Sequence, residues 1–220
     1  MLWGVSVFNK KNLLTSVLLF VSFIILMICL LLIDVRVIND TNKEIGLAFI
    51  NKISTKIEYN RTLDKGSDVF LLIGIGCLVS LIILGLVQLI KRKSLFKVDK
   101  EIIVYGLVCI FIVIMWFVFD KILIINYRPV LIDGELEASY PSTHIMLVTF
   151  LLLASSKVIS NYVKKTKIIK FLIVITCVFV GMTFVMRFIS GMHWITDCIG
   201  GLLIGLSSYY LYLSLIVKNK

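Results

Sequence analysis

Six long apolar runs dominate the sequence and limit the folds open to it. Each approaches the ~20 residues that an α-helix needs to cross a bilayer core, and none alternates as a β-barrel strand would. With 60% hydrophobic residues and a mean hydropathy of +1.04, the composition is not that of a soluble domain. We expect an all-α, polytopic membrane protein with one domain, residues 1–220, and helical spans at roughly 13–33, 69–90, 102–121, 143–160, 168–187 and 194–217.

Basic residues are distributed unevenly between the two sets of connections. If the N-terminus is cytoplasmic, the inside segments carry fourteen basic and two acidic residues, and the outside segments carry nine basic and eleven acidic residues. This asymmetry is the positive-inside pattern of a membrane protein. Topology therefore explains the net charge of +10, which argues against a nucleic-acid partner. We expect both termini on the cytoplasmic side of the cell membrane.

The longest connection, residues 34–68, carries an amphipathic pattern. Its apolar residues recur at spacings of three and four, which predicts a short helix at the outer membrane surface after the first span. A packing cap over the bundle and a role in guiding lipid are equally open for this helix. The pattern is formed by Ile45, Ala48, Phe49, Ile53 and Ile57.

Three short polar clusters interrupt the apolar runs. They read KILIINYRP at 121–129, YPSTH at 140–144 and RFISGMHWITD at 187–197. The third and fifth spans end at these clusters and the fourth and sixth begin there, so we expect all three at the outer face. Ionisable groups at membrane depth are costly unless they are paired, so their convergence predicts a functional pocket.

Three cations and a helix start in these clusters indicate an anion site. Lys121, Arg128 and Arg187 offer a point charge and two planar forks that match phosphate oxygens. Ser142 and Thr143 open the fourth span, where free backbone N–H groups and hydroxyls add further donors. This set favours a dianionic phosphate over a carboxylate.

Both histidines of the chain also lie in these clusters. His193 and Asp197 share a helix face at i and i+4, where the carboxylate can fix the imidazole tautomer and leave the other nitrogen basic. That is the arrangement of a nucleophile with a supporting acid. His144 can protonate the leaving oxygen and later activate water. We expect phosphate-ester hydrolysis through a phosphohistidine, with the cations stabilising the transition-state charge without a metal.

Other interpretations of the same residues are open. Lys121 and Arg187 can be snorkelling side chains at helix ends. A lone histidine in an apolar helix is ordinarily a core residue, although two in matching clusters favour a site. His144, His193 and Asp197 can also be a metal site of two histidines and a carboxylate. The neighbouring cations count against the metal site because they repel a divalent ion.

Taken together, the clusters resemble the three-part signature of the type 2 phosphatidic acid phosphatase superfamily, K-x6-R-P, P-S-x-H and S-R-x5-H-x3-D. The spacings agree throughout, and the six-span layout agrees as well. Two residues depart from the pattern, since Thr143 stands where glycine is usual and Met186 where serine is usual. Here the signature reads Lys121…Arg128-Pro129, Pro141-Ser142-Thr143-His144 and Met186-Arg187…His193…Asp197.

The resemblance implies a role for each matching residue. His193 would be the nucleophile, Asp197 would orient it, and His144 would act as acid and base. The family works without a metal or other cofactor. The phosphoryl group would be bound by Lys121, Arg128, Ser142, Thr143 and Arg187.

We therefore expect an integral membrane lipid phosphatase that removes the terminal phosphate of a lipid phosphate or diphosphate at an outward-facing site. Its partners would be the lipid substrate and the surrounding membrane lipids. Candidate substrates are a polyprenyl diphosphate such as undecaprenyl diphosphate, phosphatidic acid and phosphatidylglycerol phosphate. Two alternatives are a lipid phosphotransferase using the same phosphohistidine and a non-catalytic phospholipid transporter or binding protein.

Overall fold

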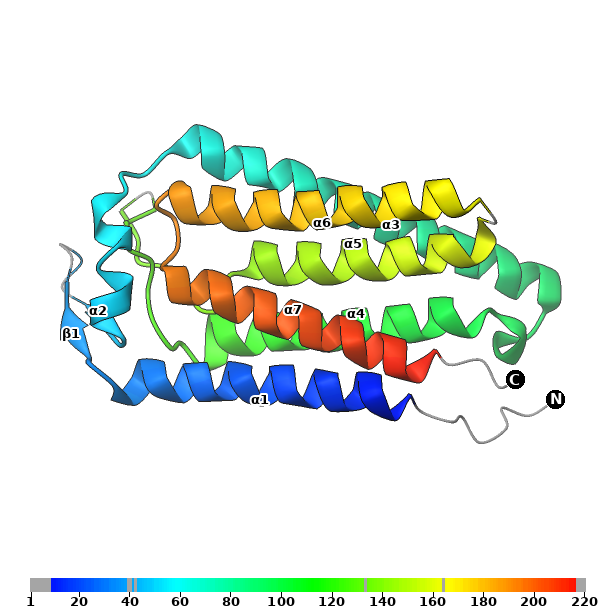
Figure 1. Cartoon of the computed structure of the whole chain (residues 1–220), viewed down its shortest axis with the longest axis horizontal. Coiled ribbons are helices and arrows are strands. Elements are labelled where there is room, and N and C mark those ends of the chain that lie inside the picture. Colours follow the sequence, from blue (N-terminus) through cyan, green and yellow to red (C-terminus); the bar gives the residue numbers. More distant parts are fainter. Residues whose placement is uncertain (1–8, 39–40, 42, 133, 164, 217–220) are drawn as a thin grey trace.

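The computed structural model describes residues 9–38, 41, 43–132, 134–163 and 165–216. It is a bundle of long helices in which α1 begins and α7 ends at the same end (Figure 1). Within the described residues, six helices are long and apolar enough to cross a membrane, which confirms the all-α, six-span fold. The helices are α1 (Lys10–Leu32), α2 (Ala48–Asn51), α3 (Arg61–Arg92), α4 (Lys100–Phe117), α5 (Thr143–Tyr162), α6 (Thr166–Ile189) and α7 (Ile195–Leu215), with short strands β1 (Arg36–Val37) and β2 (Glu44–Ile45), 3₁₀ turns η1 (Ser54–Lys56) and η2 (Leu95–Lys97), and a π-helical end to α4, η3 (Val118–Ile122).

Helix α3 begins at Arg61, well before the expected start of the second span at residue 69. Asn60 caps the helix, because its side-chain oxygen accepts from the backbone N–H groups of Thr62 and Leu63 at 3.0 and 3.1 Å. The two extra turns are polar, so hydropathy alone did not extend the span over them. They carry residues that prove to face the site.

The connection after α1 contains the expected short helix, α2, but the five apolar residues of the pattern do not share one environment. Ala48 is buried, whereas Phe49 and Ile53 are 66% and 55% exposed, and the polar residues Asn51 and Ser54 are buried. The reason is that α2 is a single turn followed by a 3₁₀ turn, so a continuous helical period does not apply.

Asn51 and Ser54 face inward because they bind the start of α7. The backbone N–H of Ile195 donates to the Ser54 hydroxyl at 3.2 Å, and the Thr196 hydroxyl donates to the Asn51 side-chain oxygen at 3.0 Å. Orphan donors at a helix start are thereby satisfied from another segment. These contacts favour the packing-cap interpretation of the 34–68 connection.

Helices α5 and α7 lie against each other at the centre of the bundle. An added Cβ at Gly201 would lie 2.5 Å from the carbonyl oxygen of Ser142, and one at Gly205 would lie 2.9 Å from that of Met146. No side chain other than hydrogen fits at such distances. The glycines therefore fix the spacing between the helix that carries His144 and the helix that carries Asp197.

Gly205→Ala is expected to lower the stability of the bundle. Its methyl group would clash with backbone at Met146 and with the Thr149 side chain, 2.8 Å away, which forces α5 and α7 apart at a cost of ~1–3 kcal/mol. Thermal unfolding of purified protein in detergent measures the change. Gly181→Ala on α6 is the matched control, since its Cβ would have nothing within 4 Å. Equal melting temperatures for the two variants would contradict the tight contact.

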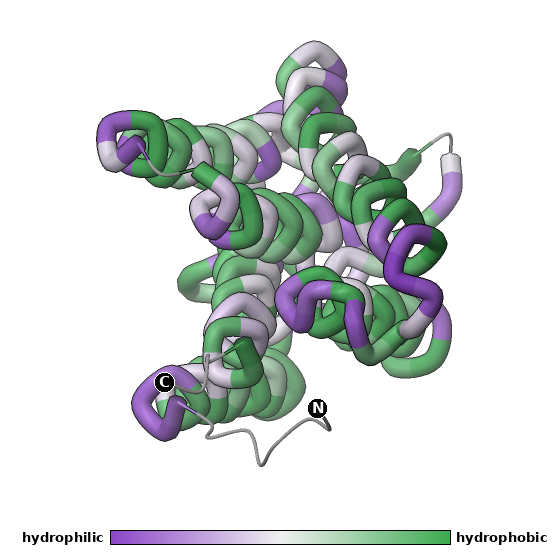
Figure 2. The backbone as a smooth tube through the Cα atoms, turned by 90° about the vertical axis from the view of Figure 1, so that its right-hand side faces the viewer, coloured by the Kyte–Doolittle hydropathy of each residue, from purple (hydrophilic) through white to green (hydrophobic). Residues whose placement is uncertain are grey.

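The outer surface of the bundle is apolar along most of its length. Seen along the helix axes, hydrophobic residues follow the helices, and hydrophilic residues gather at their ends and connections (Figure 2). Large exposed hydrophobic side chains include Leu18 on α1, Leu72 on α3, Phe111 on α4 and Val174 on α6. A surface of this kind suits lipid, whereas in water it would promote aggregation.

Candidate functional site

The connection from α4 to α5, residues 123–142, folds back on itself at the end of the bundle opposite the start of α1 (Figure 1). Its two halves pair where the backbone N–H of Arg128 donates to the carbonyl of Glu137 at 3.0 Å. The indole N–H of Trp194 donates to the carbonyl of Tyr127 at 2.7 Å. This bond ties the connection to the loop before α7, so the three polar clusters meet at one end.

A cavity of about 340 Å³ lies between these segments. That volume falls within the range of small-molecule sites, which begins at ~300 Å³. Five of the eight residues expected in the site line it, and they come from the α4–α5 connection, α5, α6 and the loop before α7. These residues are Arg128, Thr143, His144, Arg187 and His193.

His193 is buried, and its two ring nitrogens have different partners. Nδ1 lies 3.1 Å from the Ser139 hydroxyl, and Nε2 lies 3.0 Å from Nη2 of Arg187. A guanidinium only donates, so Nε2 must be the accepting, unprotonated nitrogen. The proton is therefore on Nδ1, which donates to Ser139. In this tautomer the Nε2 lone pair is directed toward the guanidinium of Arg187.

Asp197 does not contact the imidazole as closely as the i, i+4 spacing suggested. Its Oδ2 lies 3.6 Å from His193 Nδ1, and the Ser139 hydroxyl bridges the two, donating to Asp197. Asp197 also accepts from the Asn126 side-chain amide at 2.9 Å and the Trp194 backbone N–H at 3.0 Å. The carboxylate thus orients His193 through a serine relay. Neither Ser139 nor Asn126 stood out in the sequence, because an isolated serine or asparagine carries no motif.

The surroundings of His193 favour its neutral form. Burial lowers its pKa well below the usual value, and the positive charges of Arg187 and Arg128 lower it further. A neutral imidazole with an unprotonated Nε2 is the form that acts as a nucleophile. The ring is therefore in the reactive state at neutral pH without needing a separate base.

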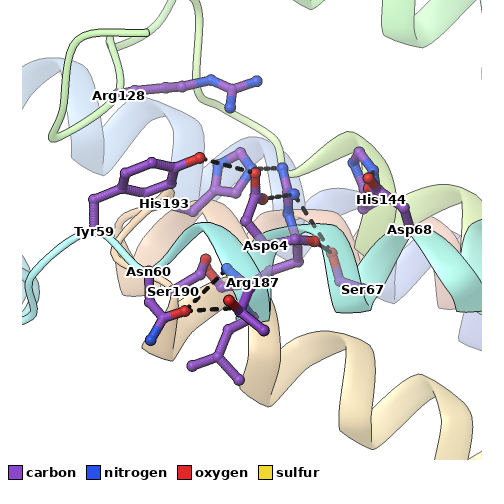
Figure 3. A network of polar contacts seen from close by, with 12 residues as sticks. Tyr59, Asn60, Asp64, Ser67, Asp68, Arg128, His144, Arg187, Ser190 and His193 are labelled. Atoms are coloured by element: carbon purple, nitrogen blue, oxygen red, sulfur yellow. Dashed lines mark hydrogen bonds and ion pairs between the residues drawn. The ribbon is translucent and has the colours of Figure 1, made fainter.

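Arg187 is held in place from α3 (Figure 3). Its Nη1 donates to Asp64 and lies 3.5 Å from the Ser67 hydroxyl, while Nη2 reaches His193. The side chain is 3% exposed, so it is not a snorkelling residue at the membrane surface. One nitrogen of its guanidinium is held by the Asp64 carboxylate, and another contacts His193.

His144 also has a carboxylate partner on α3, because its Nε2 lies 2.8 Å from Oδ1 of Asp68 (Figure 3). Neither Asp64 nor Asp68 was expected in the site. A signal for them does exist in the sequence, since they are an i, i+4 pair at the outer end of the second span. Span parity, which placed the three clusters at the outer face, places this pair at the same face.

The remaining expected residues are less directly placed. Arg128 lines the cavity and pairs with Glu137 at 3.1 Å. Ser142 is buried beside the cavity, with its backbone N–H donating to the carbonyl of Asp197 at 3.0 Å. Lys121 lies outside the cavity lining, is 67% exposed and pairs with Asp120 at 2.9 Å. The structure therefore brings two of the three expected cations together, because η3 turns the third outward.

The arrangement of possible metal ligands tests the alternative of a metal site. Across the described ranges, no group of three or more His, Cys, Asp and Glu side chains is arranged to hold a metal ion. His193 Nε2, which would have to be a ligand, faces the guanidinium of Arg187. In this arrangement a guanidinium, rather than a metal ion, lies against Nε2 of His193.

Comparison with known proteins agrees with the motifs and the fold. Residues 123–220 match the family model described as the PAP2 superfamily, which confirms the resemblance drawn from the sequence. The fold is similar to the crystal structure of the first transmembrane PAP2 type phosphatidylglycerolphosphate phosphatase from Bacillus subtilis. The TM-score is 0.61 at 19% identity, over 90% of this chain and 94% of that chain. No curated protein sequence matches significantly.

Proposed function

Because residues 123–220 match the family model of the PAP2 superfamily, we propose that this chain is a membrane lipid phosphatase. It removes the terminal phosphate of a lipid phosphate or diphosphate through a phosphohistidine. The observation that carries the proposal is the 3.0 Å contact between His193 Nε2 and the guanidinium of Arg187, which line the same cavity of about 340 Å³. An anion bound in the cavity would take over this guanidinium donor and lie beside the nucleophile.

The reaction follows from the positions of the groups. Nε2 of His193 attacks phosphorus, the bond from phosphorus to the leaving oxygen breaks, and His144 gives a proton to that oxygen. Water then attacks the phosphohistidine and gives its proton to His144, the P–N bond breaks, and inorganic phosphate leaves. Arg187 and Arg128 stabilise the charge on the equatorial oxygens in both steps. Asp197 and Ser139 keep His193 in the reactive tautomer.

Apolar side chains in the cavity lining support a lipid substrate. They come from α3, α4 with its η3 end, and α5. A phosphate ester with hydrocarbon chains would place its head group among the arginines and the start of its chains along these side chains. The fold neighbour is described as a phosphatidylglycerolphosphate phosphatase, and that lipid is one of the candidates from the sequence, with phosphatidic acid and polyprenyl diphosphates. The apolar residues are Leu71, Trp116, Phe119, Met146 and Leu147.

The charge distribution supports an outward-facing site. The cavity lies at one end of the bundle, and the connections at the opposite end carry the basic residues that the positive-inside rule assigns to the cytoplasm. Lipid phosphates of the outer leaflet would then reach the cavity directly. Both termini would be cytoplasmic.

Purified protein offered a panel of lipid phosphates should release inorganic phosphate from at least one of them. The panel contains phosphatidic acid, phosphatidylglycerol phosphate and undecaprenyl diphosphate, with free phosphate as the readout. EDTA should leave the rate unchanged, because the arginines supply the charge that a metal would otherwise provide. Lipid binding without phosphate release would contradict the proposal, and a phosphorylated alcohol as the main product would indicate a phosphotransferase.

A further inference from the structure

Helix α3 contributes one carboxylate to Arg187 and one to His144, both of which line the cavity. Asp64 and Asp68 are one helical turn apart, so they lie on the same face of α3. Asp64 binds Arg187, and Asp68 Oδ1 lies 2.8 Å from His144 Nε2 (Figure 3). Both contacts join α3 to residues that are far away in the sequence.

We propose that Asp68 is a positioning residue for His144, forming with it a second histidine–carboxylate pair that serves proton transfer to the leaving group. The inference rests on the proposed phosphatase function. The first pair, His193 with Asp197, prepares the nucleophile. The second pair prepares the acid and base, so the two chemical roles have separate carboxylates on separate helices, α7 and α3.

The contact specifies which nitrogen of His144 exchanges protons. Asp68 binds the N–H at Nε2 in both steps, because an ionised carboxylate only accepts. Nδ1–H then protonates the leaving oxygen as the P–O bond breaks. The neutral ring keeps its Nε2–H on Asp68, and Nδ1 takes a proton from the attacking water. The imidazolium is thereby restored, and one proton has passed from water to the leaving group.

A surface ion pair is the simpler alternative, since the Asp68 side chain is 49% exposed. Exposed pairs contribute little to stability and nothing specific to catalysis. The two interpretations differ in how activity depends on the leaving group. A good leaving group departs without protonation, so the loss of a general acid slows it little, whereas an alkoxide leaving group requires the proton.

The test compares Asp68→Asn with wild type on phosphatidic acid, which has an alkoxide leaving group, and on p-nitrophenyl phosphate, which has a good one. We expect kcat/KM, which reports the step that releases the leaving group, to fall ~100-fold on phosphatidic acid and only a few-fold on p-nitrophenyl phosphate. Asp68→Glu should restore part of the lost rate. Lys65→Gln is the matched control, because it removes an exposed charge from the same turns of α3 and should match wild type on both substrates.

Each outcome decides between the interpretations. A wild-type kcat/KM for Asp68→Asn on phosphatidic acid, or an equal loss of kcat/KM on both substrates, overturns the assignment of Asp68 while leaving the phosphatase function intact. Absence of phosphate release by the wild-type protein from every lipid overturns the proposed function itself, and the assignment with it. Thermal unfolding of Asp68→Asn should remain within a few degrees of wild type, because the side chain is half exposed.

Discussion

His193→Gln is expected to abolish phosphate release, with kcat reduced by ~10⁴-fold or more. The glutamine side chain can accept the hydrogen bond from Arg187, so the buried guanidinium keeps a partner. It has no nucleophilic lone pair comparable with that of Nε2, so no phosphoenzyme forms. The measurement is phosphate release under saturating lipid, together with lipid binding, which should persist.

A second variant, His144→Gln, tests the step in which water is activated. His144→Gln keeps the nucleophile but lacks the base that activates water, so with p-nitrophenyl phosphate it should release one equivalent of nitrophenol rapidly and then stall. If the histidines had only a structural role, both variants would be inactive and neither would show this burst. Turnover that survives His193→Gln would show that another group attacks phosphorus.

Arg187→Lys is expected to lower kcat by ~10²–10³-fold, although it preserves the charge. The guanidinium contacts Asp64 with Nη1 and His193 with Nη2, so it bridges two partners with a fixed fork. A lysine ammonium is a single point on a flexible stem and cannot hold both positions. Arg61→Lys on the exposed start of α3 is the control and should behave as wild type.

Lys121→Met provides a comparison at the third cation. Because Lys121 is 67% exposed and outside the cavity lining, its loss should cost much less than Arg187→Lys. A loss of equal size would mean that the segment around η3 moves when lipid binds and brings this ammonium to the phosphate. The family signature implies phosphate contact at this position, so the pair of variants separates the two arrangements.

The sequence predicted those parts of the site that depend on span parity and residue spacing. Span parity predicted that His144, His193 and Arg187 lie at one end of the bundle, because each lies where a helix begins or ends. It did not show the serine relay, since the position of Ser139 depends on how the 123–142 connection folds back. The outward turn of Lys121 was hidden for a similar reason, because a π-helical end to α4 cannot be read from hydropathy.

The acidic partners were missed for a different reason. Asp64 and Asp68 lie in polar turns before the second apolar run, and a hydropathy window assigns such turns to the loop. In the structure the Asn60 cap makes them helical and aims them at the site. Carboxylates beside a phosphate site also contradict the simple expectation that such a site contains only positive charge.

Both cavity arginines already hold a carboxylate, Arg128 through Glu137 and Arg187 through Asp64. In the proposed reaction, an incoming phosphate would displace or share a resident carboxylate instead of neutralising a bare guanidinium. The same exchange would operate in reverse after hydrolysis, when the acidic side chains bind the arginines again as inorganic phosphate leaves. Such an enzyme would resist inhibition by its own product, and it would select lipid over free phosphate through the apolar side chains of the cavity.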